Sequence, residues 1–529
     1  MKMKKIYFIL PLLAGILSVS GCTGKFEEYN RPPYQPTEFP DNDLLVKMFN
    51  VYASPQQNDC QFNNCMWACY SGQITAPYHW GRKTGIFAYF NAQEDWNQVT
   101  TNNFYSKIYP NFFELKEKKG GDGLIYSIAL LTRVYAMQEI ATLQGPLPYT
   151  TVKKGDIYVK YDSEQAAWTA MFEDLDFVIY NLKKAAPSGT NADLQQVDCI
   201  YRGNCAKWLK FANTLKLRMA IRLSGVAPEF AKLKAEEAVA DGVMTSTDDS
   251  AYDTTNSGQT NNGYKIVDGW GELKANACLV SYMNGYQDPR RSAYFTEAAE
   301  DLGGGYIGVR SGTTNPPVPN TYKGYSTFKI AVEANPGLIN AGANPMPIMY
   351  VSEAAFLRAE GAVRGWNMDG TAKALYEEGI RLSFEEFGVR GADDYMRNST
   401  LTPGDHNDPV VQADSYVNQS NITIAWEEGA TMAEKLERII TQKWIASLLN
   451  PMEGWADFRR TGYPRIFPPV VSASQQGCGL QRQMRRLHFP KSEYDTNAEN
   501  TKEAAKHLSN GIDSDNTDLW WALKSNGQY

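Results

Sequence analysis

The chain is long, acidic and rich in aromatic residues. It has 529 residues, of which 43% are hydrophobic, and a formal net charge of -7, so it is able to bury a large core. The acidic balance argues against non-specific nucleic-acid binding and against a basic membrane-surface helix, because both need a positively charged surface. Length alone favours two to four domains, but the chain shows no internal linker, and we predict one large domain.

The N-terminal residues have the features of an export signal. Three lysines precede an apolar run that is too short to span a bilayer, and small residues then lead into Cys22. This pattern resembles a bacterial lipoprotein signal, which implies cleavage after Gly21 and lipidation of Cys22. An ordinary signal peptide with an incidental cysteine is the alternative. We predict a signal peptide over 1–21, a lipidated, proline-rich tether over 22–43 and one helical domain over 44–529.

Most of the domain has the period of amphipathic helices. The strongest pattern covers 123–143 and stops before Gly145, which suits a left-handed C-terminal cap. Asp162 is the predicted N-cap of the next helix, and Thr431 opens a capping box. The segments 352–366 and 371–387 predict an antiparallel pair of the tetratricopeptide-like kind. Further helices are predicted at 43–58, 104–118, 204–223, 229–239 and 431–449.

Two stretches, 63–101 and 241–350, lack a helical period and are rich in aromatic residues, asparagine and glycine. Long irregular segments between helices often carry function. Aromatic rings stack on the C–H faces of sugars, and neighbouring polar groups reach the hydroxyls. The alternative for each aromatic residue is that it packs a loop onto the core, which we predict for the helical Trp168, Trp208 and Trp444. The candidate ligand-binding residues are Trp80, Arg82, Trp96, Asn97, Trp270, Tyr322 and Tyr325.

Cysteine spacing gives no metal site. Cys60, Cys65 and Cys69 lack the C-x₂-C spacing of zinc ribbons, so structural or free thiols are favoured there. Cys199 and Cys205 are the local candidates for a disulfide, which an exported chain allows. We therefore predict no metal and no cofactor.

Catalytic motifs are missing from the sequence. It contains no nucleophile elbow, no zinc-protease motif and no phosphate loop. Paired carboxylates for glycoside hydrolysis are defined in space and not by spacing, and no pair stands out. Asp457 with Arg459 and Arg460 predicts a solvated ion pair after a helix, and Asp288-Pro289-Arg290 predicts a turn with a structural salt bridge. A binding protein is favoured over an enzyme.

The order of several motifs, together with the lipoprotein signal, resembles the SusD/RagB lipoproteins, from Cys22 to the C-terminus. Each motif alone is weak, but their succession is specific. The motifs are Leu143–Tyr149, Ala166–Trp168 before Glu173–Asp176, Lys207–Asn213, Asp288–Arg290, Phe356–Glu360 and Glu453–Arg460.

This resemblance implies a mainly α fold, in which four tetratricopeptide-like helix pairs form a single large domain with a loop-rich ligand-binding face and little β structure. It implies a lipid-anchored protein on the outer face of the outer membrane. The implied partners are an oligosaccharide and a SusC-like TonB-dependent transporter. Peptide binding of the RagB type and, less in keeping with the motifs, a lipid-anchored glycoside hydrolase stay open as alternatives.

Overall fold

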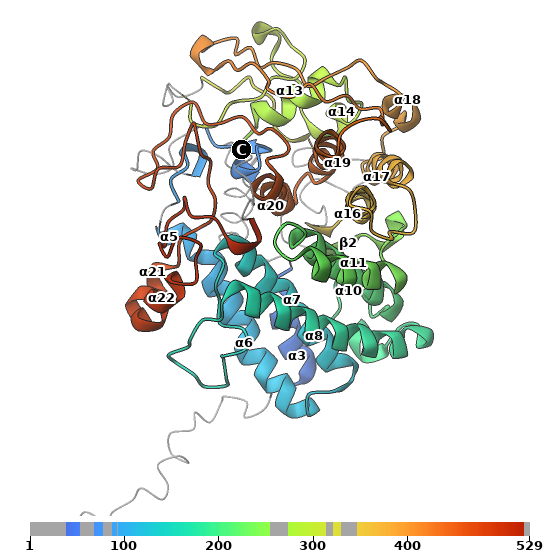
Figure 1. Cartoon of the computed structure of the whole chain (residues 1–529), viewed down its shortest axis with the longest axis vertical. Helices are drawn as coiled ribbons and strands as arrows, with labels where there is room; N and C mark the ends of the chain where they lie inside the picture. The colour runs from blue at the N-terminus through green and yellow to red at the C-terminus, as the bar shows by residue number, and fades with distance from the viewer. Residues whose placement is uncertain are drawn as a thin grey trace, which may run out of the picture.

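The structure is a computed structural model that describes residues 39–52, 68–77, 87–92, 94–253, 273–313, 321–329 and 346–522. Long helices fill the lower and middle parts of the molecule, and residues 273–313 form an irregular cap at the opposite end (Figure 1). Among the described residues, no helix combines the length and the apolar character that crossing a membrane requires.

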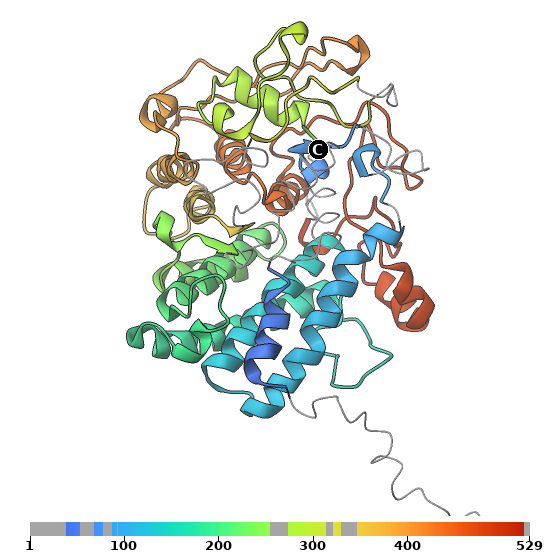
Figure 2. The same ribbon diagram turned by 180° about the vertical axis from the view of Figure 1, so that it is seen from behind.

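Helices packed in pairs form the body, which confirms the predicted mainly α, tetratricopeptide-like fold. α6 packs on α7, α7 on α8, α10 on α11 and α16 on α17, and Figure 2 shows α3 lying against α6. The longer helices are α3 (Asp41–Phe49), α6 (Val99–Lys119), α7 (Gly123–Leu143), α8 (Glu164–Ala185), α10 (Cys205–Arg222), α11 (Pro228–Ala240), α13 (Ala277–Gly285), α16 (Val351–Val363), α17 (Ala372–Glu386), α19 (Met432–Ala446), α20 (Pro451–Thr461) and α22 (Ala498–Ala505).

Short elements connect these helices. Two antiparallel pairs of strands, β1 with β3 and β2 with β4, contribute the sheet structure of the described residues. The strands are β1 (Ile74–Thr75), β2 (Ala251–Asp253), β3 (Lys274–Ala275) and β4 (Met346–Met349), and the short helices are α5 (Glu94–Asn97), α9 (Ala192–Gln195), α14 (Arg291–Tyr294), α18 (Ala392–Met396) and α21 (Lys491–Thr496).

Helix ends follow the sequence signals in two cases out of three. Gly145 has the predicted positive φ of 94°, and Thr431 forms its capping box with Glu434. The prediction for Asp162 was wrong, because Ser163 caps α8 by accepting from the backbone N–H of Ala166. Asp162 instead bridges back to the turn before it and accepts the backbone N–H of Tyr149 at 2.8 Å. Its carboxylate therefore fixes a loop and not a helix end.

One continuous hydrophobic core runs from α3 to the C-terminal residues of the described chain. Trp168, Trp208 and Trp444 are fully buried in it, as predicted. Cys199 and Cys205 are buried thiols that no disulfide joins, so the suggested local pair is not made. Cys69 is likewise a buried thiol, whereas Cys60 and Cys65 lie outside the described residues.

The predicted ion pair between Asp457 and Arg460 is made, at 2.8 Å, but it lies within α20 and is buried, so its predicted solvation was wrong. Asp457 also pairs with Lys443 Nζ at 3.0 Å, and Arg460 binds Glu360 of α16 at 2.6 Å. The sequence hid these contacts because Glu360 lies a hundred positions away. A nearby carboxylate, Glu453, bridges to Arg222 at 2.6 Å. Burial alone would raise the pKa of Glu453, but the cations beside it hold that pKa well below its usual range.

The turn at Asp288 confirms its prediction. Asp288 and Arg290 are both fully buried, and their side chains are joined at 2.7 Å. Asp288 Oδ1 also accepts the backbone N–H of Arg290 at 2.9 Å, so the aspartate closes the turn and pairs the cation. Arg290 donates to Ser383 of α17 at 2.8 Å, which ties the irregular cap to the helical body.

Candidate ligand-binding site

Residues flanking the predicted site segments lie together. β1 comes directly before residues 78–86, which carry Trp80 and Arg82, and β3 comes directly after 254–272, which carries Trp270. The two strands pair antiparallel, with Ile74 opposite Ala275 and Thr75 opposite Lys274. The described residues that flank these two segments therefore lie side by side.

Further hydrogen bonds extend this arrangement. Ser311 Oγ donates to Thr75 Oγ1 at 3.2 Å, and Tyr89 donates its hydroxyl to the carbonyl oxygen of Thr313 at 3.2 Å. Tyr89 follows the segment 78–86, and Thr313 precedes the segment 314–320. We call Thr75, Tyr89, Lys274, Ser311 and Thr313 the anchor frame, because they join the ends of three segments that are far apart in sequence.

Trp96 and Asn97 lie on α5, next to this frame. Trp96 is half-buried, with its ring centroid 6.0 Å from that of Phe87. Asn97 faces inward and is 1% exposed, and its Nδ2 donates to the carbonyl oxygen of His488 at 2.6 Å. Successive residues of a helix point about 100° apart, which is why neighbours in sequence face different surroundings here. Of these two residues, Trp96 is the one whose side chain is partly exposed.

Tyr322 and Tyr325 are brought together but are buried. Their ring centroids are 5.2 Å apart, and they are 0% and 2% exposed. Tyr325 donates its hydroxyl to Asp408 at 2.7 Å, and Tyr322 donates to Asp414 at 3.3 Å. Burial and these carboxylates raise the pKa of both phenols, so they stay protonated donors. Neither ring has an open face for stacking.

Lys274 is a frame residue that the sequence analysis did not single out. It is 8% exposed, and its Nζ donates to the carbonyl oxygens of Lys323 at 3.1 Å and Tyr325 at 3.4 Å. Burial lowers the pKa of this amine. The residues next to Lys274 in the sequence do not indicate that it is buried and bonded, because its two acceptors lie about fifty positions further along the chain.

The other predicted residues, Trp80, Arg82, Trp270 and Cys22, lie outside the described residues. Their assignment as ligand contacts and as the lipid site therefore stays a prediction. Within the described ranges, no group of three or more histidine, cysteine or acidic side chains is placed to hold a metal ion.

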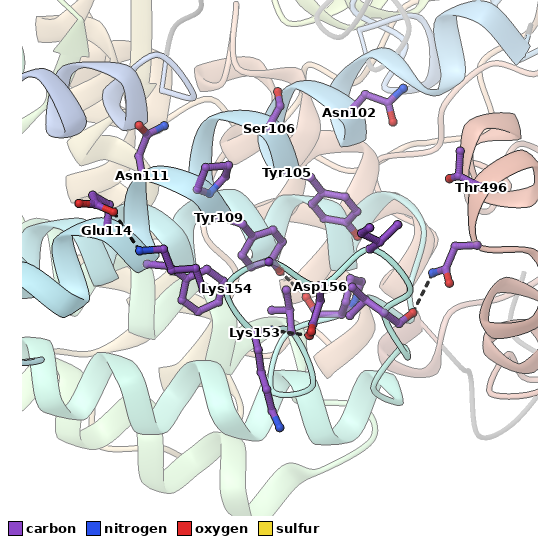
Figure 3. A pocket seen from close by; sticks show the side chains of 18 of the residues that line it. Asn102, Tyr105, Ser106, Tyr109, Asn111, Glu114, Lys153, Lys154, Asp156 and Thr496 are labelled. Atoms are coloured by element: carbon purple, nitrogen blue, oxygen red, sulfur yellow. Dashed lines mark hydrogen bonds and ion pairs between the residues drawn. The ribbon is translucent and has the colours of Figure 1, made fainter. Parts of the chain in front are cut away.

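A separate cavity of about 920 Å³ lies along α6, where the sequence analysis predicted only a helix. Tyr105, Tyr109 and Phe113 follow one another at four-residue spacing, so they share one face of α6. Figure 3 shows Tyr105 and Tyr109 above the loop that carries Lys153 and Asp156. We call this cavity the α6 groove; it is bounded by α6, residues 148–159 and residues 492–497 of the α21 region.

Comparison with known proteins gives a consistent answer. A SusD-like protein from Bacteroides thetaiotaomicron VPI-5482 is 56% identical, with a TM-score of 0.88 over 93% of this chain and all of that chain. A SusD homolog from Bacteroides ovatus ATCC 8483 is 35% identical, with a TM-score of 0.83 over 92% of this chain and 99% of that one. A chitin-binding SusD homolog from Flavobacterium johnsoniae is 32% identical, with a TM-score of 0.84 over 92% and 99%.

A search of the curated proteins finds no match to this chain. The family model described as SusD-like, "Susd and RagB outer membrane lipoprotein", matches residues 39–522 and so covers the helical body, the anchor frame and the α6 groove together. The TM-scores of 0.83 to 0.88 show that the solved structures share the fold described above. The chain belongs to the SusD-like family of outer membrane lipoproteins.

Proposed function

We propose that the protein is a cell-surface lipoprotein that binds oligosaccharides at the outer membrane and delivers them to a partner SusC-like TonB-dependent transporter. The observation that carries this proposal is the similarity, over 92% of the chain, to a SusD homolog that binds chitin. The protein binds its ligand without cleaving it and needs no metal or cofactor. The lipid on Cys22 holds it at the membrane, facing the cell exterior.

We assign the ligand site to the surface above the anchor frame. Trp80, Trp96 and Trp270 supply stacking faces, and Arg82 supplies hydrogen bonds to hydroxyls. Half-burial of Trp96 supports its role, because the core does not enclose this side chain completely. Asn97, Tyr322 and Tyr325 support the surface from below, since Asn97 Nδ2 and the two hydroxyls donate to the protein itself.

Calorimetry with a panel of oligosaccharides and peptides tests the ligand class. We expect heat of binding from at least one neutral oligosaccharide, chitin fragments being the first to try. Heat from peptides alone would instead support the RagB-type alternative. Chromatography of the same incubated sugars checks the absence of hydrolysis, and new, shorter products would favour the glycoside hydrolase.

Trp96→Ala tests the site. Loss of the stacking ring should weaken the affinity for the oligosaccharide at least about tenfold, which corresponds to roughly 1.4 kcal/mol. Trp520→Ala is the matched control. Trp520 is also half-buried on the core, but its backbone N–H donates to Glu164, at the start of α8. Equal affinities of the two variants for the oligosaccharide, with unchanged circular dichroism, would contradict the assignment of Trp96 to the ligand site.

Membrane anchoring and the transporter are tested together. Cys22→Ala should move the protein from the membrane fraction to the soluble fraction, because a lipid chain contributes about 0.8 kcal/mol per buried CH₂. Purification of the unaltered protein in mild detergent should bring along a large outer-membrane barrel. A soluble unaltered protein would contradict the anchor, and purification without the barrel would contradict the partner.

A further inference from the structure

The α6 groove has the dimensions and the lining of a ligand site. Its volume of about 920 Å³ lies at the upper end of the range of small-molecule pockets. Its floor is the row of rings on α6, in which Tyr105 and Tyr109 have centroids 5.5 Å apart and Tyr109 and Phe113 stack at 6.1 Å. Flat rings in a row suit a ligand made of flat, repeated units.

Side chains fix the walls of the groove. Tyr109 donates its hydroxyl to the carbonyl oxygen of Pro148, which ties the loop to α6. Asn497 Nδ2 donates to the carbonyl oxygen of Val159 at 2.8 Å, which ties the other end of that loop to the α21 region. Glu493 accepts the hydroxyl of Tyr161 at 2.8 Å. The groove is therefore a built feature, held open between three segments that are joined to one another.

The lysines in the lining do not present positive charge to the rings. Lys154 Nζ contacts Glu114 at 3.0 Å, and the side chain of Lys153 points away from the rings (Figure 3). Glu493, which also lines the groove, places a negative charge near Tyr105. An anionic ligand would therefore lose its hydration without meeting an opposite charge at the rings, which is costly.

Uncharged polar groups complete the lining. The amide of Asn102 and the hydroxyls of Ser106 and Thr496 lie around the rings. Such groups exchange hydrogen bonds with hydroxyls without requiring a net charge. The groove has walls of helix and loop, whereas a peptide bound by strand addition needs an exposed sheet edge.

We propose that the α6 groove is a second binding site, specific for a short saccharide without acidic groups that stacks on the half-buried Tyr105. This site is separate from the surface above the anchor frame, because the residues that line the groove include neither Trp96 nor any residue of the frame. The groove's own lining carries the inference, whatever the ligand of the first site. The saturated protein therefore holds a saccharide in the groove in addition to the ligand of the first site.

Ile157 provides a local reporter. It lines the groove and is 77% exposed, so its δ1 methyl group senses a bound ligand without being needed for the fold. In methyl NMR of the full mature chain, we expect chitotetraose, cellotetraose or maltotetraose to shift the Ile157 signal, which Ile157→Leu identifies by its loss. An unmoved Ile157 signal with all three sugars overturns the proposal.

Two comparisons sharpen the test. Ser106→Trp fills the groove from its exposed edge and should reduce the affinity reported by Ile157 at least about tenfold. Lys116→Trp places the same ring on an exposed part of α6 outside the groove and should leave that affinity unchanged. Equal affinities for both variants would overturn the site.

Charge selectivity is tested with a neutral and an acidic ligand. Tetragalacturonate, at a pH where its carboxylates are charged, should bind at least about tenfold more weakly than the neutral tetrasaccharide that binds best. Equal binding would contradict a site that excludes acidic saccharides. A synthetic peptide of residues 24–38 is the last probe, because Phe39 at the end of that segment also lines the groove. A shift from this peptide and from no sugar would replace the proposal with an occupant from the chain itself.

Discussion

In the helical half of the molecule, α6–α11 and α16–α20, helices distant in sequence are joined by buried ion pairs such as Arg218 with Glu353 at 2.6 Å. In the loop-rich half, residues 273–313, 321–329, 398–425 and 462–489, backbone carbonyls accept several of the joining bonds. Tyr286 donates to the carbonyl oxygen of Ile422 at 2.9 Å, and Arg310 donates to that of Pro468 at 3.0 Å.

This difference follows from the backbone. Helices satisfy their own carbonyl groups, so only side chains remain to join them, and a buried cation then needs a carboxylate. Irregular segments leave carbonyl oxygens free, and tyrosine and arginine side chains satisfy them. The helical half should therefore be sensitive to loss of charge and the loop-rich half to loss of single hydrogen bonds.

The largest effect is expected for Glu453→Gln. This change leaves Arg222 without its charged partner in a buried site, which typically costs about 3–5 kcal/mol of unfolding free energy. Urea unfolding followed by circular dichroism measures it. Glu499→Gln is the control, because the Glu499 side chain is 92% exposed and its pair with Lys502 contributes little. A similarly small loss of unfolding free energy for Glu453→Gln and Glu499→Gln would contradict the expected sensitivity of the helical half to loss of charge.

Glu386 is a buried carboxylate of the helical half that is held by hydroxyl groups and not by a cation. It accepts the hydroxyls of Ser250 at 2.8 Å and Ser352 at 2.5 Å, and burial raises its pKa from 4.5 to about 7. Below pH 4.5 the group is protonated in the folded and the unfolded chain. Between pH 4.5 and about pH 7 the folded chain keeps a proton on Glu386 that the unfolded chain releases. The unfolding free energy therefore falls as pH rises through this range, by about 3 kcal/mol in total.

Glu386→Gln should remove that part of the pH dependence, as measured by urea unfolding at a series of pH values. Ser352→Ala removes a hydrogen bond that favours the charged carboxylate, so the fall in stability should extend to higher pH. An identical pH profile for the parent and Glu386→Gln would contradict the assignment of this group.

The smallest effect is expected in the loop-rich half, for Tyr325→Phe. The ring stays in place, and only the hydrogen bond to Asp408 is lost, so the unfolding free energy should fall by about 1 kcal/mol. Asp408 keeps its bond from the backbone N–H of Val411 at 2.7 Å. Tyr180→Phe, on a 59% exposed residue, serves as the control in thermal unfolding. If Tyr325→Phe lowered the unfolding free energy as much as Glu453→Gln does, the proposed difference between the two halves would be contradicted.

The helices could be predicted because their signals are local. The apolar period fixed 123–143 to the residue, and the caps at Gly145 and Thr431 are set by neighbours within four positions. α5 and α13 were missed, since helices of four and nine residues show too little of the period inside an aromatic stretch.

The sites depend on contacts that no local pattern records. Tyr325 is buried by a bond to Asp408, 83 positions away, and the α6 groove brings Asn102 within 3.1 Å of Ser492, 390 positions away. The burial of Asp457 was missed for the same reason, because Lys443 and Glu360, which flank its pair with Arg460, come from other helices. Residue type alone identified aromatic candidates, but not which of their faces the fold would cover.

The anchor frame has a practical consequence. Its bonds join Thr75, Lys274, Ser311, Tyr89 and Thr313, which all lie outside the segments 78–86, 254–272 and 314–320. A new sequence between the same end points therefore leaves the residues that make these bonds unchanged. Recognition can diversify in this scaffold, by evolution or by grafting, without the fold being redesigned.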